Sequence, residues 1–357
     1  MKKRVVGLGE VLWDLLPHGA CLGGAPANFA YITTLMGDQG VVASCVGEDS
    51  RGLEALRKLE ERGLDIDHVQ TDREHPTGTV KVDLDGNGQA RFEIGHPVAW
   101  DFLHWTLDWQ NLAEAADAVC FGSLAQRSEA SRLTIRKFVA ATSPRTVKVF
   151  DVNLRQSFYS RDILADSMKL ADIVKFNDDE LPKIMKLYEF PHKDESSSAR
   201  KLSKEFDLDV VCVTRGGRGS LLVRGDQVSE HPGFKVHVAD TVGSGDAFTA
   251  GLVHEYLHGA SLDLMNEVAN LVGAWVASEV GAMPTPSAVL WSIPWPKSAS
   301  GLPSCERLLL LSIYTVVLAR GDYELHRCKK VCLLLFTSFR HHADRALMPY
   351  GRLYETG

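Results

Sequence analysis

The chain of 357 residues is long enough for one large α/β domain or for two smaller ones. Its 45% hydrophobic and 24% charged residues are ordinary for a globular protein, and its net charge of -7 argues against a nucleic-acid partner, because no basic excess could neutralise phosphates. The seven scattered cysteines indicate reduced thiols rather than a disulfide framework.

The N-terminal segment predicts a buried strand rather than a targeting sequence. Residues 5–11 are mostly apolar, but Glu10 and Asp14 interrupt the longer apolar run that a signal peptide needs. We therefore expect a cytoplasmic protein with no membrane partner. A glycine turn with a proline follows at residues 23–28, which is typical of a helix start, and the helix should end near Gly37.

Strands and helices alternate through most of the following chain. Residues 53–62 have amphipathic helical spacing. Short apolar runs typical of buried strands occur at residues 41–46, 118–121, 147–152, 173–176 and 210–214. This alternation predicts an α/β fold with a mainly parallel sheet and helices on both of its faces.

One segment interrupts this alternation. Residues 79–84 and 89–94 flank Asp85-Gly-Asn-Gly88, a sequence that predicts a β-hairpin. A hairpin inside an α/β core usually projects from it. This hairpin could be a surface feature with no role in binding, or it could cover a ligand.

The most informative stretch runs from Asp240 to Gly251. Residues 234–239 alternate apolar and polar side chains, which predicts a strand, and helical spacing follows the glycine turn. Gly243 and Gly245 allow successive N–H groups to point into one concavity at a helix N-terminus, which favours an anion. Asp246 in this turn either caps the helix or accepts a proton from a hydroxyl that attacks a bound phosphoryl group.

Polar residues also follow other predicted strands. Asp151-Val-Asn-Leu-Arg155 follows one strand, where open α/β sheets place ligand groups, although Arg155 could simply pair with Asp151 at the surface. Asn177-Asp-Asp-Glu180 follows the next strand and would otherwise be an acidic helix start. The glycine loop at residues 214–219 is by itself a weak signal. The chain contains no P-loop, no dinucleotide fingerprint and no nucleophile elbow.

The stretch Asp240-Thr-Val-Gly-Ser-Gly-Asp246 resembles the C-terminal signature of the PfkB, or ribokinase-like, carbohydrate kinases, with Ser244 where alanine is usual. Gly23-Gly-Ala-Pro-Ala-Asn28 and the Asp151–Arg155 element are similar to sequences of fructokinases. The resemblance covers roughly residues 4–286 in the order of the family. It implies a ribokinase-like three-layer αβα core with a mainly parallel sheet and a small β lid, formed by strands at about residues 11–22 and 76–98.

The resemblance also implies an activity, namely ATP-dependent phosphorylation of a sugar, with fructose as the first candidate. It implies Mg²⁺ as cofactor, K⁺ as a further candidate, and a homodimer through the lid. Ribose, 2-keto-3-deoxygluconate and nucleosides stay open as acceptors, and so does an inactive sugar-binding protein on the same fold.

Each motif then implies a role for particular residues. The catalytic group comprises Asp246 as base with Gly243, Ser244 and Gly245. The sugar-binding group, which also includes Asp246, comprises Asp14, Gly23, Gly24, Asn28 and Arg155. The ATP-binding group comprises Asn177, Thr214, Gly216, Gly219, Gly245 and Asn270. Glu180 would hold Mg²⁺ through water, and Asp240 is a candidate ligand of a monovalent cation.

The last part of the chain, residues 287–357, does not follow the family pattern. Two apolar runs occur there, at residues 308–319 and 331–336, and the first is too short to span a bilayer. Its histidines and cysteines have no standard zinc spacing. We interpret residues 1–286 as the kinase domain and the remainder as an atypical tail of uncertain order.

Overall fold

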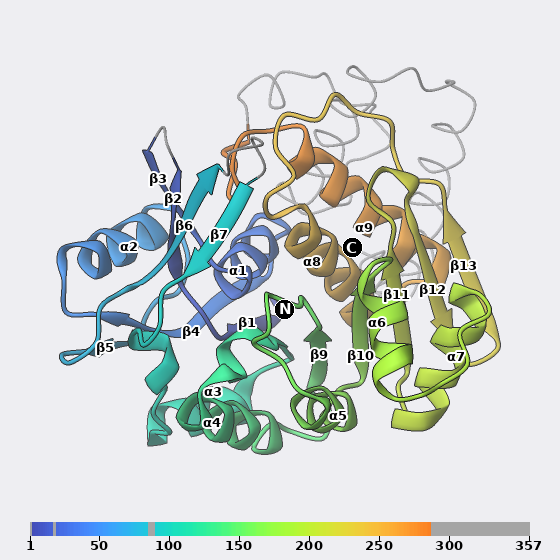
Figure 1. Ribbon diagram of the computed structural model, residues 1–357, viewed down its shortest axis with the longest axis horizontal. Coiled ribbons are helices and arrows are strands. Elements are labelled where there is room, and N and C mark those ends of the chain that lie inside the picture. Colours follow the sequence, from blue (N-terminus) through green and yellow to red (C-terminus); the bar gives the residue numbers. More distant parts are fainter. Residues whose placement is uncertain (1, 17–18, 85–89, 287–357) are drawn as a thin grey trace, which may run out of the picture.

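The structure is a computed structural model that describes residues 2–16, 19–84 and 90–286 (Figure 1). The segment expected to be an atypical tail, residues 287–357, lies outside the described residues, as does the turn of the predicted hairpin. No helix among the described residues is long and apolar enough to cross a membrane.

A nine-stranded sheet forms the centre of the fold, in the order β13-β12-β11-β10-β9-β8-β1-β4-β5. The parallel part of the sheet consists of β11, β10, β9, β8, β1, β4 and β5, and β12 and β13 are antiparallel additions at one edge. Their bounds are β1 Arg4–Leu8, β4 Gln39–Gly47, β5 Val69–Asp72, β8 Ala118–Gly122, β9 Val147–Asp151, β10 Ile173–Asn177, β11 Val210–Thr214, β12 Ser220–Arg224 and β13 Gln227–His231. The predicted parallel sheet is confirmed.

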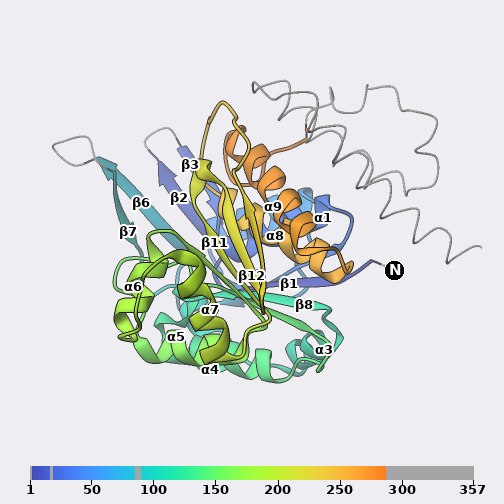
Figure 2. The ribbon, with the colours of Figure 1, turned by 90° about the vertical axis from the view of Figure 1, so that its right-hand side faces the viewer.

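Helices cover both faces of this sheet, which gives three layers (Figure 2). One apolar core lies under α1, α2, α8 and α9, and the other lies under α3 to α7. The bounds are α1 Ala25–Leu35, α2 Ser50–Glu61, α3 Leu107–Ala115, α4 Glu129–Ala140, α5 Arg161–Leu170, α6 Glu180–Leu187, α7 Glu195–Phe206, α8 Ser244–Leu257 and α9 Leu262–Ala277. The strands read as continuous apolar runs because both of their faces are buried.

A separate four-stranded sheet stands away from this core in the order β3-β2-β6-β7 (Figure 2). Its strands are β2 Leu12–Leu16, β3 Gly19–Gly23, β6 Gly78–Leu84 and β7 Ala90–Ile94. The two segments expected to form a lid thus pair with each other, since β2 lies parallel to β6. Strands β6 and β7 pair antiparallel, as the hairpin signal predicts.

The strand expected at residues 234–239 is not present. Strand β13 already ends at His231, and a glycine with a positive φ of 77° follows at Gly233. Within the described part of the chain, no strand pairs with these alternating residues. Ala239 instead donates its N–H to the carbonyl of Ala277 at 2.9 Å. Alternation alone was misleading, because Val238 is 55% exposed and no sheet face buries it. An irregular segment therefore leads into α8.

Candidate functional site

The site lies where the parallel strands end and where α1 and α8 begin. Carboxyl ends of parallel strands are where open α/β sheets bind ligands. Helix α8 starts at a tight turn in which Gly243 has a φ of 78°, and a Cβ there would lie 2.4 Å from that of Ala282. Only glycine fits this turn. The N–H groups of Gly245 and Asp246 lie in the first helical turn and have no intrahelical partner, whereas that of Ser244 donates to Thr241 at 3.3 Å.

Asp246 lies at this helix start and contacts α1 directly. Its Oδ2 atom accepts a hydrogen bond of 2.8 Å from Nδ2 of Asn28. Burial and the nearby charge of Asp151 raise the pKa of Asp246 to about 6, against the lowering effects of Asn28 and Lys175. A carboxylate with this pKa is ionised at neutral pH yet basic enough to accept a proton.

A second carboxylate, Glu10, lies in the same pocket. It follows β1, is 3% exposed, and burial raises its pKa to about 7. Among the residues that the structure describes, Oε2 of Glu10 and Oδ1 of Asn28 are buried without a hydrogen-bond partner. The pocket is lined by Glu10, Ala25, Pro26, Phe29, Cys120, Phe121, Gly122, Asp151, Asn153, Asp246 and Thr249. A bound ligand with hydroxyl groups could satisfy both acceptors.

Asp14 approaches from the smaller sheet. It lies on β2 opposite Cys21 of β3, and burial raises its pKa to about 6, against the lowering effect of Arg155. A Cβ at Gly23 would lie 2.7 Å from the Oδ2 atom of Asp14, so this neighbour has to be glycine for the carboxylate to keep its place. The arginine is exposed, and its charge also lowers the pKa values of Glu10 and Asp246. These four charged groups therefore influence one another.

A buried hydrogen-bond network holds the first turn of α8, which carries Asp246. Nζ of Lys175 on β10 lies 2.8 Å from Oδ1 of Asp151 on β9, and both side chains are more than 90% buried. The other oxygen of Asp151 accepts a 3.0 Å hydrogen bond from Thr249, which also bonds to the carbonyl of Gly245. Burial works against the ammonium form, but the charges of Asp151 and Glu180 raise the pKa of Lys175. This network fixes the start of α8 on the sheet.

Asn177 and Glu180 form a compact unit at the end of β10. Oδ1 of Asn177 accepts the N–H groups of Asp179 and Glu180 at 3.0 and 2.8 Å. The two oxygens of Glu180 accept the N–H groups of Leu154 and Asn177 at 2.8 and 2.9 Å. Burial raises the pKa of Glu180, against the lowering effect of Lys175. The glutamate thus holds two loops of the site together.

The glycine loop after β11 lies beside this unit. The carbonyl of Thr214 accepts the N–H of Asp178 at 2.9 Å, and Gly216 and Gly219 have φ values of 55° and 82°. Arg215, whose effect was uncertain from the sequence, pairs with Glu195 of α7 at 2.5 Å.

Asn270 and Asp240 make internal bonds. The amide nitrogen of Asn270 donates to Ser220 and to the carbonyl of Asn266, both at 2.7 Å. A contact of this residue with adenine stays a prediction. The carboxylate of Asp240 accepts the N–H groups of Val242 and Gly281 at 3.0 and 3.1 Å, which ties the glycine turn to the chain after α9.

The sequence predictions missed several residues of this arrangement. Asp151, Lys175 and Thr249 were not selected as site residues, and their contact joins three separate segments of the chain. Glu10 could have been found, because it is a single charge within an apolar run that should be buried. The structure brings Glu10, Asp151 and Asp246 together in the lining of one pocket, and Asn28 adjoins them through its bond to Asp246.

Comparison with known proteins gives a family match over most of the chain. The pfkB family of carbohydrate kinases matches residues 21–288. Among curated proteins, a fructokinase of Escherichia coli is 32% identical over 270 residues, which cover 71% of this chain and 84% of that protein. A putative sugar kinase of Pyrococcus horikoshii is 30% identical over 272 residues, covering 74% and 83% of the two chains.

Solved structures agree with this match. The ATP complex of the Pyrococcus horikoshii sugar kinase has a TM-score of 0.67 at 30% identity and covers 79% of this chain and 95% of that chain. A fructokinase of Vibrio cholerae O395, bound to fructose, ADP and a calcium ion, has a TM-score of 0.66 at 27% identity and covers the same shares. The fold is therefore ribokinase-like, and of these two similar kinases one binds ATP and the other binds fructose, ADP and a calcium ion.

Proposed function

Because this chain belongs to the PfkB family of carbohydrate kinases, we propose that it transfers the γ-phosphoryl group of ATP to a hydroxyl of fructose. The observation that carries this proposal is the contact of Asp246 with Asn28, at a helix N-terminus and beside two buried acceptors without partners. A polyol supplies the hydroxyl donors that these acceptors lack. The helix N-terminus favours the anionic phosphoryl group.

In this mechanism Asp246 acts as the general base. As the sugar oxygen forms its bond to the γ-phosphorus, the hydroxyl proton moves to the Asp246 carboxylate, and the bond to the bridging oxygen breaks, so that ADP leaves with the electron pair. The N–H groups of Gly245 and Asp246 stabilise the charge on the phosphoryl oxygens. Asn28 orients the base through the bond of 2.8 Å.

Asp14, Gly24, Asn28 and Arg155 would bind the other sugar hydroxyls. The smaller sheet would act as a lid over the sugar and as the contact of a homodimer. Asn177, Thr214 and the loop at residues 216–219 would bind the nucleotide.

Mg²⁺ would supply positive charge beside the phosphates, and the residues present fit an indirect contact. Both Glu180 oxygens already accept backbone N–H groups. Each oxygen retains a lone pair for a metal-bound water, and Mg²⁺ commonly keeps several waters. K⁺ is proposed beside Asp240, whose carboxylate orders the glycine turn.

The decisive experiment is ADP release by the full chain with Mg²⁺-ATP and a panel of acceptors. The panel contains fructose, ribose, 2-keto-3-deoxygluconate and a nucleoside, since curated relatives include a ribose-1-phosphate kinase and an aminoimidazole riboside kinase. We expect the highest kcat/KM with fructose. A higher value with another acceptor would overturn the choice of sugar.

Sugar binding without any turnover would instead favour an inactive sugar-binding protein on this fold. Calorimetric titration of the same sample with fructose, with and without ATP, separates that outcome from a misfolded preparation. A folded sample that neither binds nor phosphorylates any acceptor of the panel would contradict both functions.

A further inference from the structure

A second cluster of polar side chains lies at the opposite end of the two helices that carry the kinase site. Helices α1 and α8 pack side by side, and the bond between Asn28 and Asp246 joins them near their starts (Figure 1). Asp38 follows the end of α1, and His254 lies in the last part of α8. With a rise of about 1.5 Å per residue, His258 is about 18 Å along α8 from Asp246. The cluster is therefore separate from the kinase site.

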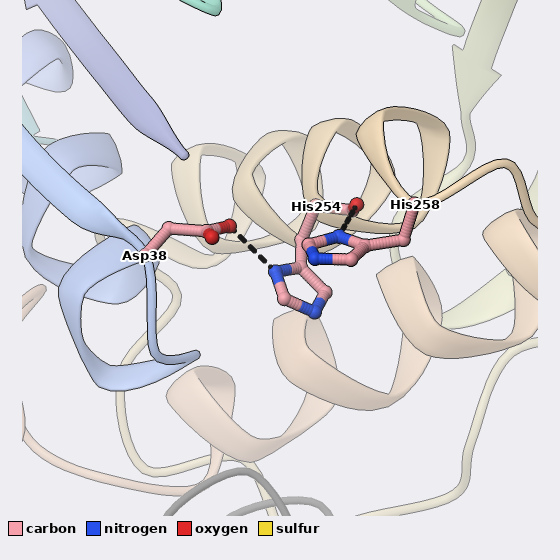
Figure 3. Close-up of side chains that lie close together, drawn as sticks. All are labelled: Asp38, His254 and His258. Carbon is pink, nitrogen blue, oxygen red and sulfur yellow. Dashed lines mark hydrogen bonds and ion pairs between the residues drawn. The ribbon is translucent and has the colours of Figure 1, made fainter. Parts of the chain in front are cut away.

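The cluster consists of Asp38, His254 and His258, whose ligand atoms all lie within 4.8 Å of one another (Figure 3). Nδ1 of His254 lies 2.8 Å from Oδ2 of Asp38. His258 is four residues further along the same helix, so both imidazoles lie on one face, and their ring centroids are 4.3 Å apart. Asp38 and His254 are buried, whereas His258 is exposed.

A hydrogen bond fixes which nitrogen of His258 can bind a cation. Nδ1 of His258 lies 2.7 Å from the carbonyl oxygen of His254 and has to donate to it, so the lone pair of the neutral ring is on Nε2. The other oxygen of Asp38 accepts the N–H of Lys3 at 3.1 Å, which orients the carboxylate. Such supporting bonds are typical of metal ligands.

We propose that Asp38, His254 and His258 form a binding site for a divalent transition-metal cation of the Zn²⁺ type. Two imidazoles and one carboxylate are a ligand set that Zn²⁺ accepts, with water in the fourth position. Metal–ligand bonds of about 2.0–2.2 Å require Oδ2 of Asp38 and Nδ1 of His254, now 2.8 Å apart, to separate slightly, and the His258 ring to move within reach of the same ion. The exposed ring of His258 can make this movement. When the metal binds Nδ1 of His254, that nitrogen gives up its proton and Nε2 takes one from solvent, so the bound ring stays neutral.

The helical sequence His254-Glu-Tyr-Leu-His258 has the spacing in which two histidines bind zinc in metalloproteases. In those enzymes the glutamate acts as a general base. Glu255 is 8% exposed here, on a helix packed between α1 and α9, and is not one of the three clustered residues. The site is therefore assigned a binding role that joins α8 to the end of α1, without hydrolytic chemistry.

The test uses the full chain, stripped with a chelator and then titrated with Co²⁺, whose visible absorption reports on nitrogen and oxygen ligands, and with Zn²⁺ in competition. The chain contains 13 histidines, so the informative quantity is the difference between variants. Because supporting residues alone contribute about 10- to 100-fold to metal affinity, His258→Ala should weaken the site by about 100-fold or more. His237→Ala removes an exposed histidine outside the cluster and should leave the titration unchanged.

A further variant distinguishes direct binding of the metal by residue 258 from an indirect loss of metal affinity. His258→Cys should restore Co²⁺ binding and add a sulfur-to-cobalt charge-transfer band in the near ultraviolet. Zn²⁺ should also raise the Tm of the wild-type chain but not that of His258→Ala, because binding to the folded state stabilises it. Equal Co²⁺ spectra, Zn²⁺ affinities and Tm shifts for the wild type and His258→Ala would overturn the proposal. His258 is exposed, so its replacement should leave the fold intact.

Discussion

The proposed kinase site has a sugar half and a nucleotide half, which differ in how far the protein itself supplies hydrogen-bond partners for their polar atoms. In the sugar half, formed by Glu10, Asp14 and Asn28, two buried acceptors lack partners, and the pKa values of both carboxylates are raised by burial. In the nucleotide half, formed by Asn177, Glu180 and Asn270, the first two side chains accept backbone N–H groups and that of Asn270 donates to Ser220.

This difference indicates two ways of binding. Unsatisfied buried acceptors cost free energy until a ligand supplies donors, so we expect the proposed sugar half to select ligands with hydroxyl groups in fixed places. The proposed nucleotide half is held in place by internal hydrogen bonds before any ligand binds. Asp246 lies at the boundary, since it bonds to Asn28 on one side and its pKa responds to the charges of Asp151 and Lys175 on the other.

The largest expected effect comes from Asp246→Asn. This change keeps the size of the side chain but removes the proton acceptor, so kcat should fall by about 10²- to 10⁴-fold, with much smaller changes in sugar and ATP binding. Steady-state kinetics and calorimetric titration measure the two effects separately. Asp263→Asn is the matched control, because it removes a carboxylate from the first turn of α9, where it is exposed. Near-normal turnover of a folded Asp246→Asn variant would show that the residue is only a helix cap.

Breaking the buried pair should have the next largest effect, on stability. Lys175→Met leaves the Asp151 carboxylate buried without its partner, and such a change costs about 3–5 kcal/mol of unfolding free energy. Urea denaturation measures it. Lys148→Met is the control, because its pair with Asp172 is partly exposed and should be worth less than about 1 kcal/mol.

A second change sharpens this experiment. Adding Asp151→Asn to Lys175→Met removes the uncompensated charge and should recover part of the lost stability. Equal costs for the two lysine variants would mean that the buried pair does not hold the start of α8 on the sheet.

Much of the fold could be predicted because local patterns determine it. The parallel strands are short apolar runs, and the start of α8 is marked by Gly243 and Gly245. Residues 234–239 show the limit of such patterns, since alternation indicates a strand only where another strand is available for pairing. Whether a partner strand exists depends on the whole fold.

The site was predictable where a motif is contiguous in the chain, and less so where it is assembled from distant segments. Asp246 stands out within its own turn. The contact of Thr249 with Asp151 joins residues 98 positions apart, and no local pattern reports it. The spacing of His254 and His258 was visible in the sequence, but the third member, Asp38, is 216 residues from His254 and required the structure.

Replacing Glu10 with glutamine tests, through the stability of the folded protein, whether burial raises the pKa of this carboxyl group. The pKa of Glu10 is raised from 4.5 to about 7 by burial, so the folded state binds this proton more tightly than the unfolded chain. Its ionisation therefore lowers stability as the pH rises from about 4.5 to 7, by about 3 kcal/mol at most. The glutamine variant should unfold at higher urea than the wild type at pH 8, and the two should converge near pH 5. If the difference between the unfolding midpoints of the two proteins in urea is the same at pH 5 and pH 8, the raised pKa is contradicted.

The smallest expected effect is a shift in the pH profile on Asn28→Asp. Burial and Asp151 give Asp246 a pKa of about 6, so kcat/KM of the wild type should fall tenfold per pH unit below that value as the base becomes protonated. The new carboxylate would replace a donor that lies 2.8 Å from Asp246, and two carboxylates this close share one proton. The acid limb should then move upward by about one pH unit. Asn28→Ala, which only removes the donor, should shift it less in the same direction, and Asn111→Asp, exposed on α3, should not shift it. Profiles that coincide for all four proteins would mean that Asp246 is not the titrating base, and the boundary between the two halves would have to be placed elsewhere.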